Sequence, residues 1–428
     1  MTNDTASTLP TINVSGRASA GAGAFSVVIT GDVCPQLRGE ERILAGEEAA
    51  IFAKVAPFLT DADLRIVQWE TPLASQPNPI PKSGPNLNCA PATARLAAVN
   101  AFDLALLANN HIGDQGPAAV VETMGHLRAV GVRSVGAGAN LTEAEAPAVF
   151  EIGGRSLAVL NFAENEFGGA TGTRAGFAPL SPLRNLAAIR EARQQHDLVI
   201  VALHGGHERN PFPSPRMQAL FRAYAEAGAH VVFNCHTHCP EGVEFHQGTP
   251  VVHCPGNFYF PKPAAIAPNP VWWTGYLPKF HFDAKGCHAV ELLPYVFNED
   301  EVAPLTGDAF AEFERYFQKL CQPLSNPAEL QALFESWSSH SAQGYLTKLS
   351  QSIPPDWVNR LDDREVFQRL LGLRNQFTCE SHADMSACYL RLVEEGRLEE
   401  ARKRIPELLA YQTPPWGDPS GTPAPSIP

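Results

Sequence analysis

Carboxylates, carboxamides and imidazoles follow successive apolar runs in this sequence. The first run ends in TGDVCP and supplies Asp32, the second ends in QWETP and supplies Glu70, and the third ends in ANNHIGDQG. Two later runs end in HGGHER at 204–209 and NCHTH at 234–238. Carboxylate and amide oxygens suit Mn, Mg or Ca, and imidazoles suit Zn, Fe or Mn. The residue types therefore predict a divalent metal site.

The apolar runs that precede these residues are short and rich in β-branched side chains, which is typical of buried strands. They alternate with segments of helical character, such as 117–131 and 215–229, so the sequence predicts an α/β fold. In such folds the carboxyl ends of the strands form the ligand crevice, and we expect the polar residues to meet there. The expected strands are 25–30, 64–70, 103–110, 157–164, 197–204, 230–238 and 250–258.

Each of these residues also has a simpler interpretation. A carboxylate after a strand is most often a helix cap or a loop charge, and a buried histidine is most often a core residue with satisfied hydrogen bonds. Cys235 and Cys239 flank the histidine pair, but a structural zinc site would need a second ligand pair at a suitable spacing, and none lies nearby. The shared metal site is favoured because five strand ends in series carry such residues.

The amino-acid composition narrows the possible partners of the protein and its expected cellular compartment. The chain has 428 residues and a formal net charge of −13, and it carries no basic run, so nucleic acid is not an expected partner. Nine cysteines at irregular spacing predict reduced thiols in a cytoplasmic protein rather than a disulfide framework. The first residues lack the features of a secretory signal, and no window approaches a spanning helix, so we expect no membrane anchor.

The sequence divides into four parts. Two ends are polar or rich in Pro and Gly, and we expect them to be disordered. A long C-terminal stretch carries Phe310, Phe313 and Phe317 at helical spacing, and it forms either ordinary packed helices or a lid that selects a peptide substrate. The parts are a tail at 1–24, a body at 25–300, a helical region at 307–410 and a second tail at 411–428.

Two blocks carry a resemblance to a known family. LLANNHIGDQG at 106–116 and GNF at 256–258, together with HGGHE and NCHTH, resemble the CapA family of capsule and poly-gamma-glutamate synthesis proteins. That family is similar to the calcineurin-like metallophosphatases. The resemblance covers about residues 25–260, and it implies a four-layer αββα sandwich with a metal centre at one sheet edge. The helical region would then be a C-terminal extension of this sandwich.

The resemblance also implies roles for individual residues. His111 would be the acid–base residue and Asp114 would orient it. His207 is a further catalytic candidate for a different reason, since it follows a strand end and would be the next proton carrier to consider. The histidine of the family's first motif is replaced here by Cys34, so one tightly bound ion is expected as readily as a pair. The ion would be Mn, Zn, Fe, Mg or Ca. The implied metal ligands are Asp32, Glu70, Asn110, His204, His236 and His238.

These features predict a metal-dependent, hydrolase-like enzyme that uses acid–base chemistry on a peptide-like or polyanionic substrate, such as a polyglutamyl amide. Three other functions stay open at this point. They are a peptide Cα epimerase of a peptide-modification pathway, a phosphoesterase, and a non-catalytic accessory protein in capsule or polymer synthesis. The sequence gives no indication of the oligomeric state.

Overall fold

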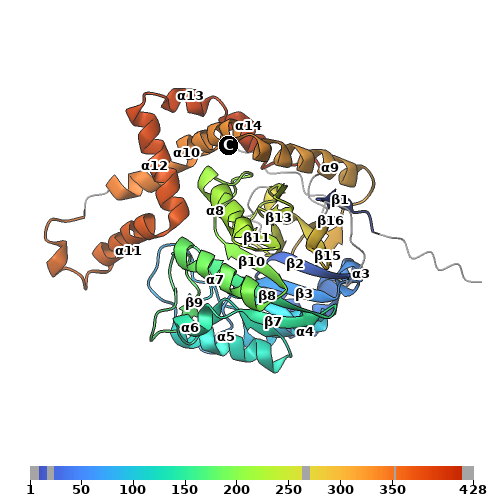
Figure 1. Cartoon of the computed structure of the whole chain (residues 1–428). Helices are drawn as coiled ribbons and strands as arrows, with labels where there is room; N and C mark the ends of the chain where they lie inside the picture. Colours follow the sequence, from blue (N-terminus) through green and yellow to red (C-terminus); the bar gives the residue numbers. More distant parts are fainter. Residues whose placement is uncertain (1–8, 17–23, 263–269, 351–352, 417–428) are drawn as a thin grey trace, which may run out of the picture.

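Two β-sheets pack face to face in the body of the protein, and helices cover both outer faces (Figure 1). The computed structural model describes residues 9–16, 24–262, 270–350 and 353–416. Every apolar run that the sequence predicts to be a strand contains one, because each run is long enough to cross a sheet and apolar enough to be buried on both faces.

The first sheet has nine strands among the described residues, and its centre is parallel. β2, β3, β4 and β5 lie side by side in that order, which brings their carboxyl ends to one edge. β15 and β16 form an antiparallel hairpin beside β2. The strands are β1 (Ile12–Ser15), β2 (Phe25–Val33), β3 (Leu64–Trp69), β4 (Leu104–Leu106), β5 (Arg133–Val135), β14 (Asn257–Tyr259), β15 (Thr274–Asp283), β16 (Gly286–Phe297) and β17 (Val302–Pro304).

The second sheet has six strands in the order β12-β13-β11-β10-β8-β7. β8, β10, β11 and β13 are parallel, so this sheet also gathers strand carboxyl ends at one edge. β6 (Ala137–Gly138) and β9 (Gly176–Phe177) form a separate short pair. The six strands are β7 (Ala148–Ile152), β8 (Arg155–Ala163), β10 (Leu198–His204), β11 (Val231–Cys235), β12 (Val243–His246) and β13 (Thr249–Val252).

Three apolar cores separate the four layers. Ile66 of the first sheet and Ile200 of the second are buried in the core between the sheets. A second core joins the first sheet to α1, α3, α4 and α5, and a third joins the second sheet to α7 and α8. The body is thus the four-layer αββα sandwich that the resemblance implies. Its helices are α1 (Arg38–Leu44), α2 (Glu48–Ile51), α3 (Ala56–Thr60), α4 (Arg95–Val99), α5 (Pro117–Ala129), α6 (Leu141–Ala144), α7 (Pro182–Gln195) and α8 (Pro215–Glu226).

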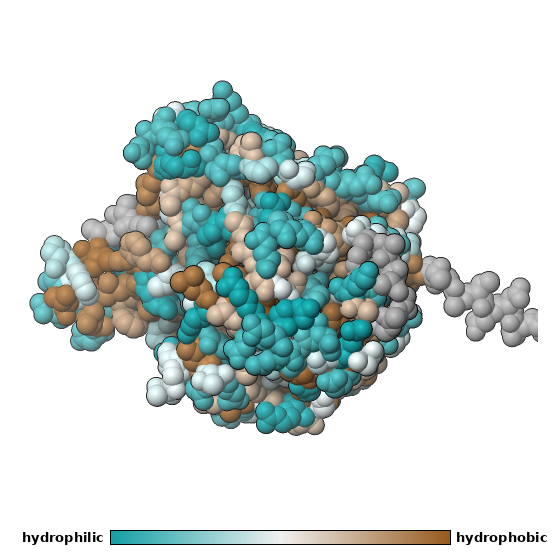
Figure 2. All heavy atoms as spheres, viewed as in Figure 1, coloured by the Kyte–Doolittle hydropathy of each residue, from teal (hydrophilic) through white to brown (hydrophobic). Residues whose placement is uncertain are grey.

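The C-terminal helices form a fourth core of their own, in which Trp337 and Leu392 are buried together with Phe212 of the body. Figure 1 shows them in orange and red along one side of the sandwich, with α11 in an arm that projects from it. Apolar residues are visible on this arm in Figure 2, and Phe377 of α11 is 73% exposed. The helices are α9 (Gly307–Cys321), α10 (Pro327–Ser350), α11 (Arg364–Thr378), α12 (Glu380–Glu394), α13 (Leu398–Arg402) and α14 (Ile405–Ala410).

Parts of both expected tails are ordered, contrary to the sequence-based expectation. β1 lies within the N-terminal tail and pairs antiparallel with β16, which would otherwise leave an open sheet edge. In the C-terminal tail, Trp416 packs against Phe313 and Tyr316, which removes apolar surface of the indole from water. The rest of these tails, at 1–8, 17–23 and 417–428, lies outside the described residues.

Two expectations from composition concern thiols and membranes. All nine cysteines are free, and Cys235 and Cys239 are buried as small core residues. Burial raises the pKa of both thiols well above the ordinary value, so they stay protonated. Among the residues that the structure describes, no helix has the length and hydropathy needed to cross a bilayer.

Candidate metal centre

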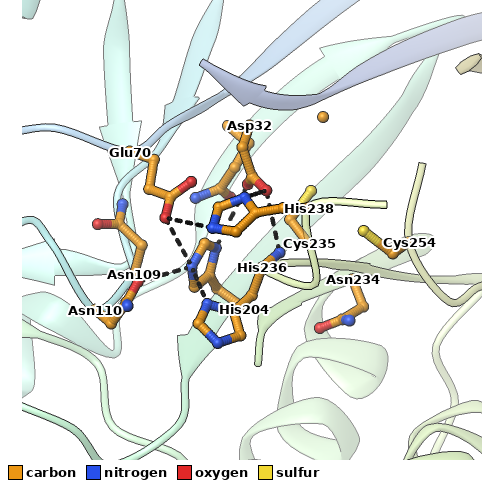
Figure 3. A network of polar contacts seen from close by, with 12 residues as sticks. Asp32, Glu70, Asn109, Asn110, His204, Asn234, Cys235, His236, His238 and Cys254 are labelled. Carbon is orange, nitrogen blue, oxygen red and sulfur yellow. Dashed lines mark hydrogen bonds and ion pairs between the residues drawn. The ribbon is translucent and has the colours of Figure 1, made fainter. Parts of the chain in front are cut away.

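Six polar side chains come together where the carboxyl ends of the two sheets meet, three from each sheet (Figure 3). From the first sheet, Asp32 lies within β2, Glu70 follows β3 directly, and Asn110 lies in the loop after β4. From the second sheet, His204 ends β10, and His236 and His238 follow β11. All six are buried. The structure therefore brings together every residue that the resemblance implies as a metal ligand.

His204 lies at the centre of this cluster. Its Nε2 atom is 3.0 Å from Oδ1 of Asn110, 3.2 Å from Nδ1 of His236 and 3.6 Å from Oε1 of Glu70. Its Nδ1 atom is 3.7 Å from Oδ1 of Asp32. Burial and the neighbouring imidazoles lower the pKa of His204 well below its ordinary value, so the ring is neutral and can act as a ligand.

Glu70 has the least satisfied carboxylate of the cluster. Neither Oε1 nor Oε2 has a hydrogen-bond partner among the described residues, although both atoms are buried. Burial and the charge of Asp32 raise the pKa of Glu70 well above its ordinary value. Oε1 lies 3.9 Å from Nε2 of His238, which is too long for a hydrogen bond. Two buried carboxylates, each with an oxygen that lacks a hydrogen-bond partner among the described residues and faces imidazole rings, fit a cation that would supply the missing partner.

The ligand atoms form two overlapping groups that share Glu70. One group is Glu70 with His236 and His238, and the other is Glu70 with Asp32 and His204, each with its ligand atoms within 4.8 Å of one another. A set of carboxylate oxygens and imidazole nitrogens suits Zn, Mn or Fe better than Ca or Mg, which prefer oxygen ligands alone. Cys34 is buried beside Cys89, and burial raises the pKa of its thiol well above the ordinary value.

The two histidines after β11 occupy strained backbone conformations. His236 has φ of 107° and His238 has φ of 57°, a region that non-glycine residues avoid. Such residues cost about 1–3 kcal/mol each and persist only where the surroundings hold them. Two contacts do so here, since the backbone N–H of His236 donates to Oδ2 of Asp32 at 3.2 Å and Nδ1 of His238 lies 2.8 Å from Oδ1 of Asn257.

His111 and Asp114 lie beside the ligand cluster. Nδ1 of His111 is 2.7 Å from Oδ2 of Asp114, and its Nε2 faces Oε1 of Glu70 at 4.0 Å. Asp114 in turn accepts from Nζ of Lys82 at 2.5 Å and from the backbone N–H of Leu87 at 2.7 Å. Burial, followed by the charge of Lys82, lowers the pKa of His111. The ring is thus held neutral, with Nδ1–H on Asp114 and the Nε2 lone pair directed toward the cluster.

His207 is placed differently from its expected role as a catalytic residue. Its Nε2 atom donates to the backbone carbonyl of Ser381 in α12 at 2.9 Å, and its ring packs on Phe334 of α10. Burial lowers the pKa of His207 to about 3, so the ring is neutral near pH 7 and its Nε2 proton is engaged by Ser381. In the fold this side chain joins the loop after β10 to the C-terminal helices.

The chain from residue 26 to residue 262 matches the family described as bacterial capsule synthesis protein PGA_cap. This match covers more than half of the chain. The protein belongs to the PGA_cap family. Its αββα body is the metallophosphatase-like fold of that family, and the C-terminal helices lie beyond the matched segment.

Three curated relatives of this PGA_cap chain bear names connected with polymer synthesis. It is 26% identical over 272 residues to the PGA biosynthesis protein CapA of Bacillus subtilis, which covers 61% of this chain and 69% of that one. It is 25% identical to the capsule biosynthesis protein CapA of Bacillus anthracis, over 60% of this chain and 64% of that one. A probable polyglutamine synthesis accessory protein of Mycobacterium tuberculosis is 26% identical over 34% of this chain and 42% of its own.

Several residues of this PGA_cap site were missed by sequence reasoning. Asn257 orients the ring of His238, although only the GNF block as a whole had been noted. Lys82 comes from a Pro-rich loop far from His111 in sequence, and its role has no local signal. Trp272 packs on His238 with ring centroids 4.6 Å apart, and Lys262 lies over the Trp272 ring. Their aromatic and basic types could not be tied to the site without the fold.

A second buried carboxylate, Glu164, follows β8 next to this cluster. Its Oε1 accepts from Nη2 of Arg216 at 2.6 Å and from the hydroxyl of Ser381 at 2.9 Å, and its Oε2 accepts from the backbone N–H of Gly206 at 3.3 Å. The backbone N–H of Asn165 donates to Oε2 of Glu380 at 2.9 Å. The loops after β8 and β10 are thus fastened to the first turn of α12.

Proposed function

We propose that this protein is a metal-dependent enzyme that acts on an amide bond of a peptide-like chain, such as a glutamyl polymer. The observation that carries the proposal is the convergence of six strand-end ligands around a buried Glu70 carboxylate without a hydrogen-bond partner among the described residues. Removing two carboxylates from water at one place is costly unless a cation accompanies them.

A divalent ion held by these residues would polarise a carbonyl oxygen or lower the pKa of a bound water to about 7. Asp32 and Glu70 would hold it with carboxylate oxygens, and the imidazole nitrogens of His204, His236 and His238 would complete the set. Asn110 adds an amide oxygen without adding charge. This set leaves the protein with no need for a nucleophilic side chain of its own.

His111 supplies the proton-transfer group of the proposed mechanism. Its Nδ1–H donates to Asp114, so the Nε2 lone pair is free to take a proton from an attacking water and to return it to the departing amine. The contact from Nζ of Lys82 holds Asp114 in place. Because burial keeps His111 neutral, it is ready to act as a base at pH 7.

The names of the relatives support the proposed substrate class. They refer to PGA, capsule and polyglutamine synthesis, and a chain of glutamine or glutamyl units is joined by amide bonds. An amide carbonyl is polarised by a divalent ion in the same way as other acyl groups. A polymer-processing step, cleavage or transfer at an amide, is the reaction that fits both the names and the ligand set.

The test begins with elemental analysis of protein prepared without chelator, followed by amide cleavage assays on γ-glutamyl and α-glutamyl oligomers. We expect about one or two divalent ions per chain and amide cleavage that chelation abolishes. His236→Ala should lose both metal and activity. His246→Ala is the matched control, since that histidine pairs with Glu226 and lies outside the cluster.

Two results would contradict the proposal. Wild-type protein without stoichiometric metal would favour a non-catalytic accessory role. Metal-loaded protein that cleaves phosphodiesters, or that exchanges Cα protons for deuterium in peptides, but leaves every amide intact would assign the site to a different reaction.

A further inference from the structure

The C-terminal helices form one wall of a cavity that opens at the metal centre. This cavity has a volume of about 290 Å³ and is lined on one side by His236 and Glu208. Its other side is lined by Trp337 and His340 of α10 and by His382 of α12. The segment that matches the PGA_cap family ends at residue 262, so this wall is a feature of this chain beyond the family match.

A second cavity continues from the first. It has a volume of about 470 Å³ and lies between α10, α11 and α12. Tyr345 and His382 line both cavities, and their rings pack at a centroid distance of 4.8 Å. The two cavities therefore meet at this pair and form one groove that leads from His236 to α11. Together they fall in the size range of binding sites for sizeable ligands, about 300–1,000 Å³.

The lining of the groove suits a chain of amide groups. Gln368 and Asn375 of α11 offer both donors and acceptors, as peptide groups do, and Oδ1 of the buried Asn375 has no hydrogen-bond partner among the described residues. Tyr345 and Trp337 supply flat apolar surface for methylene groups.

The charges that line the groove are balanced. Among the described lining residues, Glu208 and Glu365 are matched in number by Arg209 and Arg369, and Arg369 is already paired with Glu365 at 2.6 Å. Such a surface does not select a ligand by net charge, because a polyanion would meet as many carboxylates as guanidinium groups.

The wall is held firmly in place. Glu164 and His207 of the body bond to Ser381 at the start of α12, and Nη1 of Arg374 in α11 donates to the backbone carbonyl of Glu166 at 2.8 Å. Nδ2 of Asn375 donates to Oε2 of Glu166 at 3.2 Å. A wall fixed by this many bonds is a preformed surface, which lowers the entropy cost of binding.

We propose that α10, α11 and α12 form a substrate groove for an extended peptide-like chain, which is recognised through its main-chain amides and not through charged side chains. This inference rests on the proposed function, because the chain would place one of its amides at the metal centre. The groove would hold the residues that follow on one side of that amide. Affinity would then grow with chain length and depend little on salt.

Gly372 gives a sharp test of this groove. It lies within α11 and lines the second cavity, and a Cβ built on it would meet no atom within 4 Å. Because the Cβ position is open, we expect Gly372→Trp to fill the groove, and its Tm checks that the fold is kept. The probes are labelled oligo-γ-glutamate and labelled oligoglutamine of about ten residues, bound to the full-length Mn²⁺-loaded protein and followed by fluorescence polarisation. We expect a loss of affinity of at least about 10-fold for both probes, with unchanged metal content.

The matched control is Gly125→Trp. Gly125 lies in α5, outside the lining of either cavity, and it also has no atom within 4 Å of an added Cβ. This variant should bind both probes as the wild type does. If Gly372→Trp lowers Tm, Gln368→Trp, one turn earlier on the same helix and lining the same cavity, replaces it.

The outcomes separate the groove from the reaction. Wild-type affinity in both groove variants, or no binding of either probe by the wild type, would overturn the groove. Binding of oligo-γ-glutamate alone, weakened more than about 10-fold between about 50 and 500 mM salt, would overturn recognition through main-chain amides. Probe binding that Gly372→Trp weakens, in a protein that cleaves no amide, would support the groove and remove the proposed function.

Discussion

Glu70 and Glu164 follow strands of opposite sheets, and both are buried, but their surroundings differ. Glu164 has a cation of its own chain, since Arg216 donates to it together with Ser381. Glu70 has none within hydrogen-bond distance among the described residues, and it faces imidazoles. Burial alone would raise the pKa of Glu164, but the charge of Arg216 and the bond from Ser381 outweigh it and lower the pKa. Burial and Asp32 raise the pKa of Glu70.

The difference indicates how the two carboxylates are used. A carboxylate whose bonds are all satisfied within the chain holds structure together, and here it fastens α12 to the body. A carboxylate buried without such bonds is stable only with a ligand from outside the chain. Four experiments can sharpen or break this contrast, and they are given from the largest expected effect to the smallest.

Glu70→Gln should have the largest effect. The amide keeps the size of the side chain but removes the charge that both ligand groups share. We expect metal affinity to fall by at least about 1,000-fold and activity to disappear, with the helical secondary structure unchanged. Metal titration followed by calorimetry measures the metal affinity. Circular dichroism checks that the helical secondary structure is unchanged. Full metal retention would mean that Glu70 is not the partner of a cation.

His111→Ala should lower turnover by about 100-fold or more at nearly constant metal content, since general acid–base help contributes about 100- to 10,000-fold. Asp114→Asn should give a smaller loss, because it leaves the imidazole present but less well oriented. Turnover and metal stoichiometry are measured on the same preparations. Metal and activity lost in step would make His111 a ligand instead of a proton carrier.

Glu164→Gln should leave metal content unchanged but lower the free energy of unfolding by about 2 kcal/mol, since the partly exposed Arg216 loses one of its two charged partners and keeps only Asp384. The pKa of Glu164 is lowered in the folded state from its ordinary value of 4.5, so its contribution is present above that pH and is lost as the pH falls below it. Denaturant unfolding at several pH values should show the variant and the wild type converging in acid.

Hydrogen exchange then shows which part of the protein is destabilised by Glu164→Gln. Amides of α11 and α12 should exchange faster in Glu164→Gln, while those of β10 stay protected. Glu226→Gln, at a surface pair with His246, is the control and should change neither quantity measurably. If both variants lowered the free energy of unfolding equally, Glu164 would contribute no more to stability than a carboxylate in an ordinary surface ion pair.

Asn257→Ala should have the smallest effect. Asn257 orients His238 through Nδ1 but is not itself one of the expected ligands. Loss of such an outer partner typically lowers metal affinity by about 10- to 100-fold, and we expect the lower end because Asp32 also lies near that nitrogen, at 3.4 Å. Competition with a chelator of known affinity measures the metal affinity of the variant. An effect as large as that of Glu70→Gln would place Asn257 among the ligands.

The resemblance to CapA proteins implied the sandwich of two sheets, but the strands and the meeting of polar strand-end residues could be predicted from the sequence itself, and for a common reason. Buried parallel strands appear as uninterrupted apolar runs, and the residue just beyond each run lies at the ligand edge, as Asp32, Glu70 and His204 do. The resemblance to CapA proteins then supplied the roles expected of these residues.

What the sequence could not provide were contacts between distant segments that lack a periodic pattern. Lys82 reaches Asp114 from an irregular loop, and His207 turns toward α12, whose position no local signal reveals. β1 pairs with β16 across most of the chain, although its own residues read as a polar tail. These contacts depend on tertiary geometry, which a single sequence does not encode locally.

The left-handed backbone at His236 and His238 has a consequence for how this protein would change under selection. Each of these residues stores backbone energy that a glycine would release, and the ring at 236 packs on other histidines of the cluster, His204 and His238. In a library selected only for thermal stability, and not for metal binding or turnover, variants with glycine at position 236 would be among the first to become common. Retention of histidine at this position would show that a property other than thermal stability was being selected.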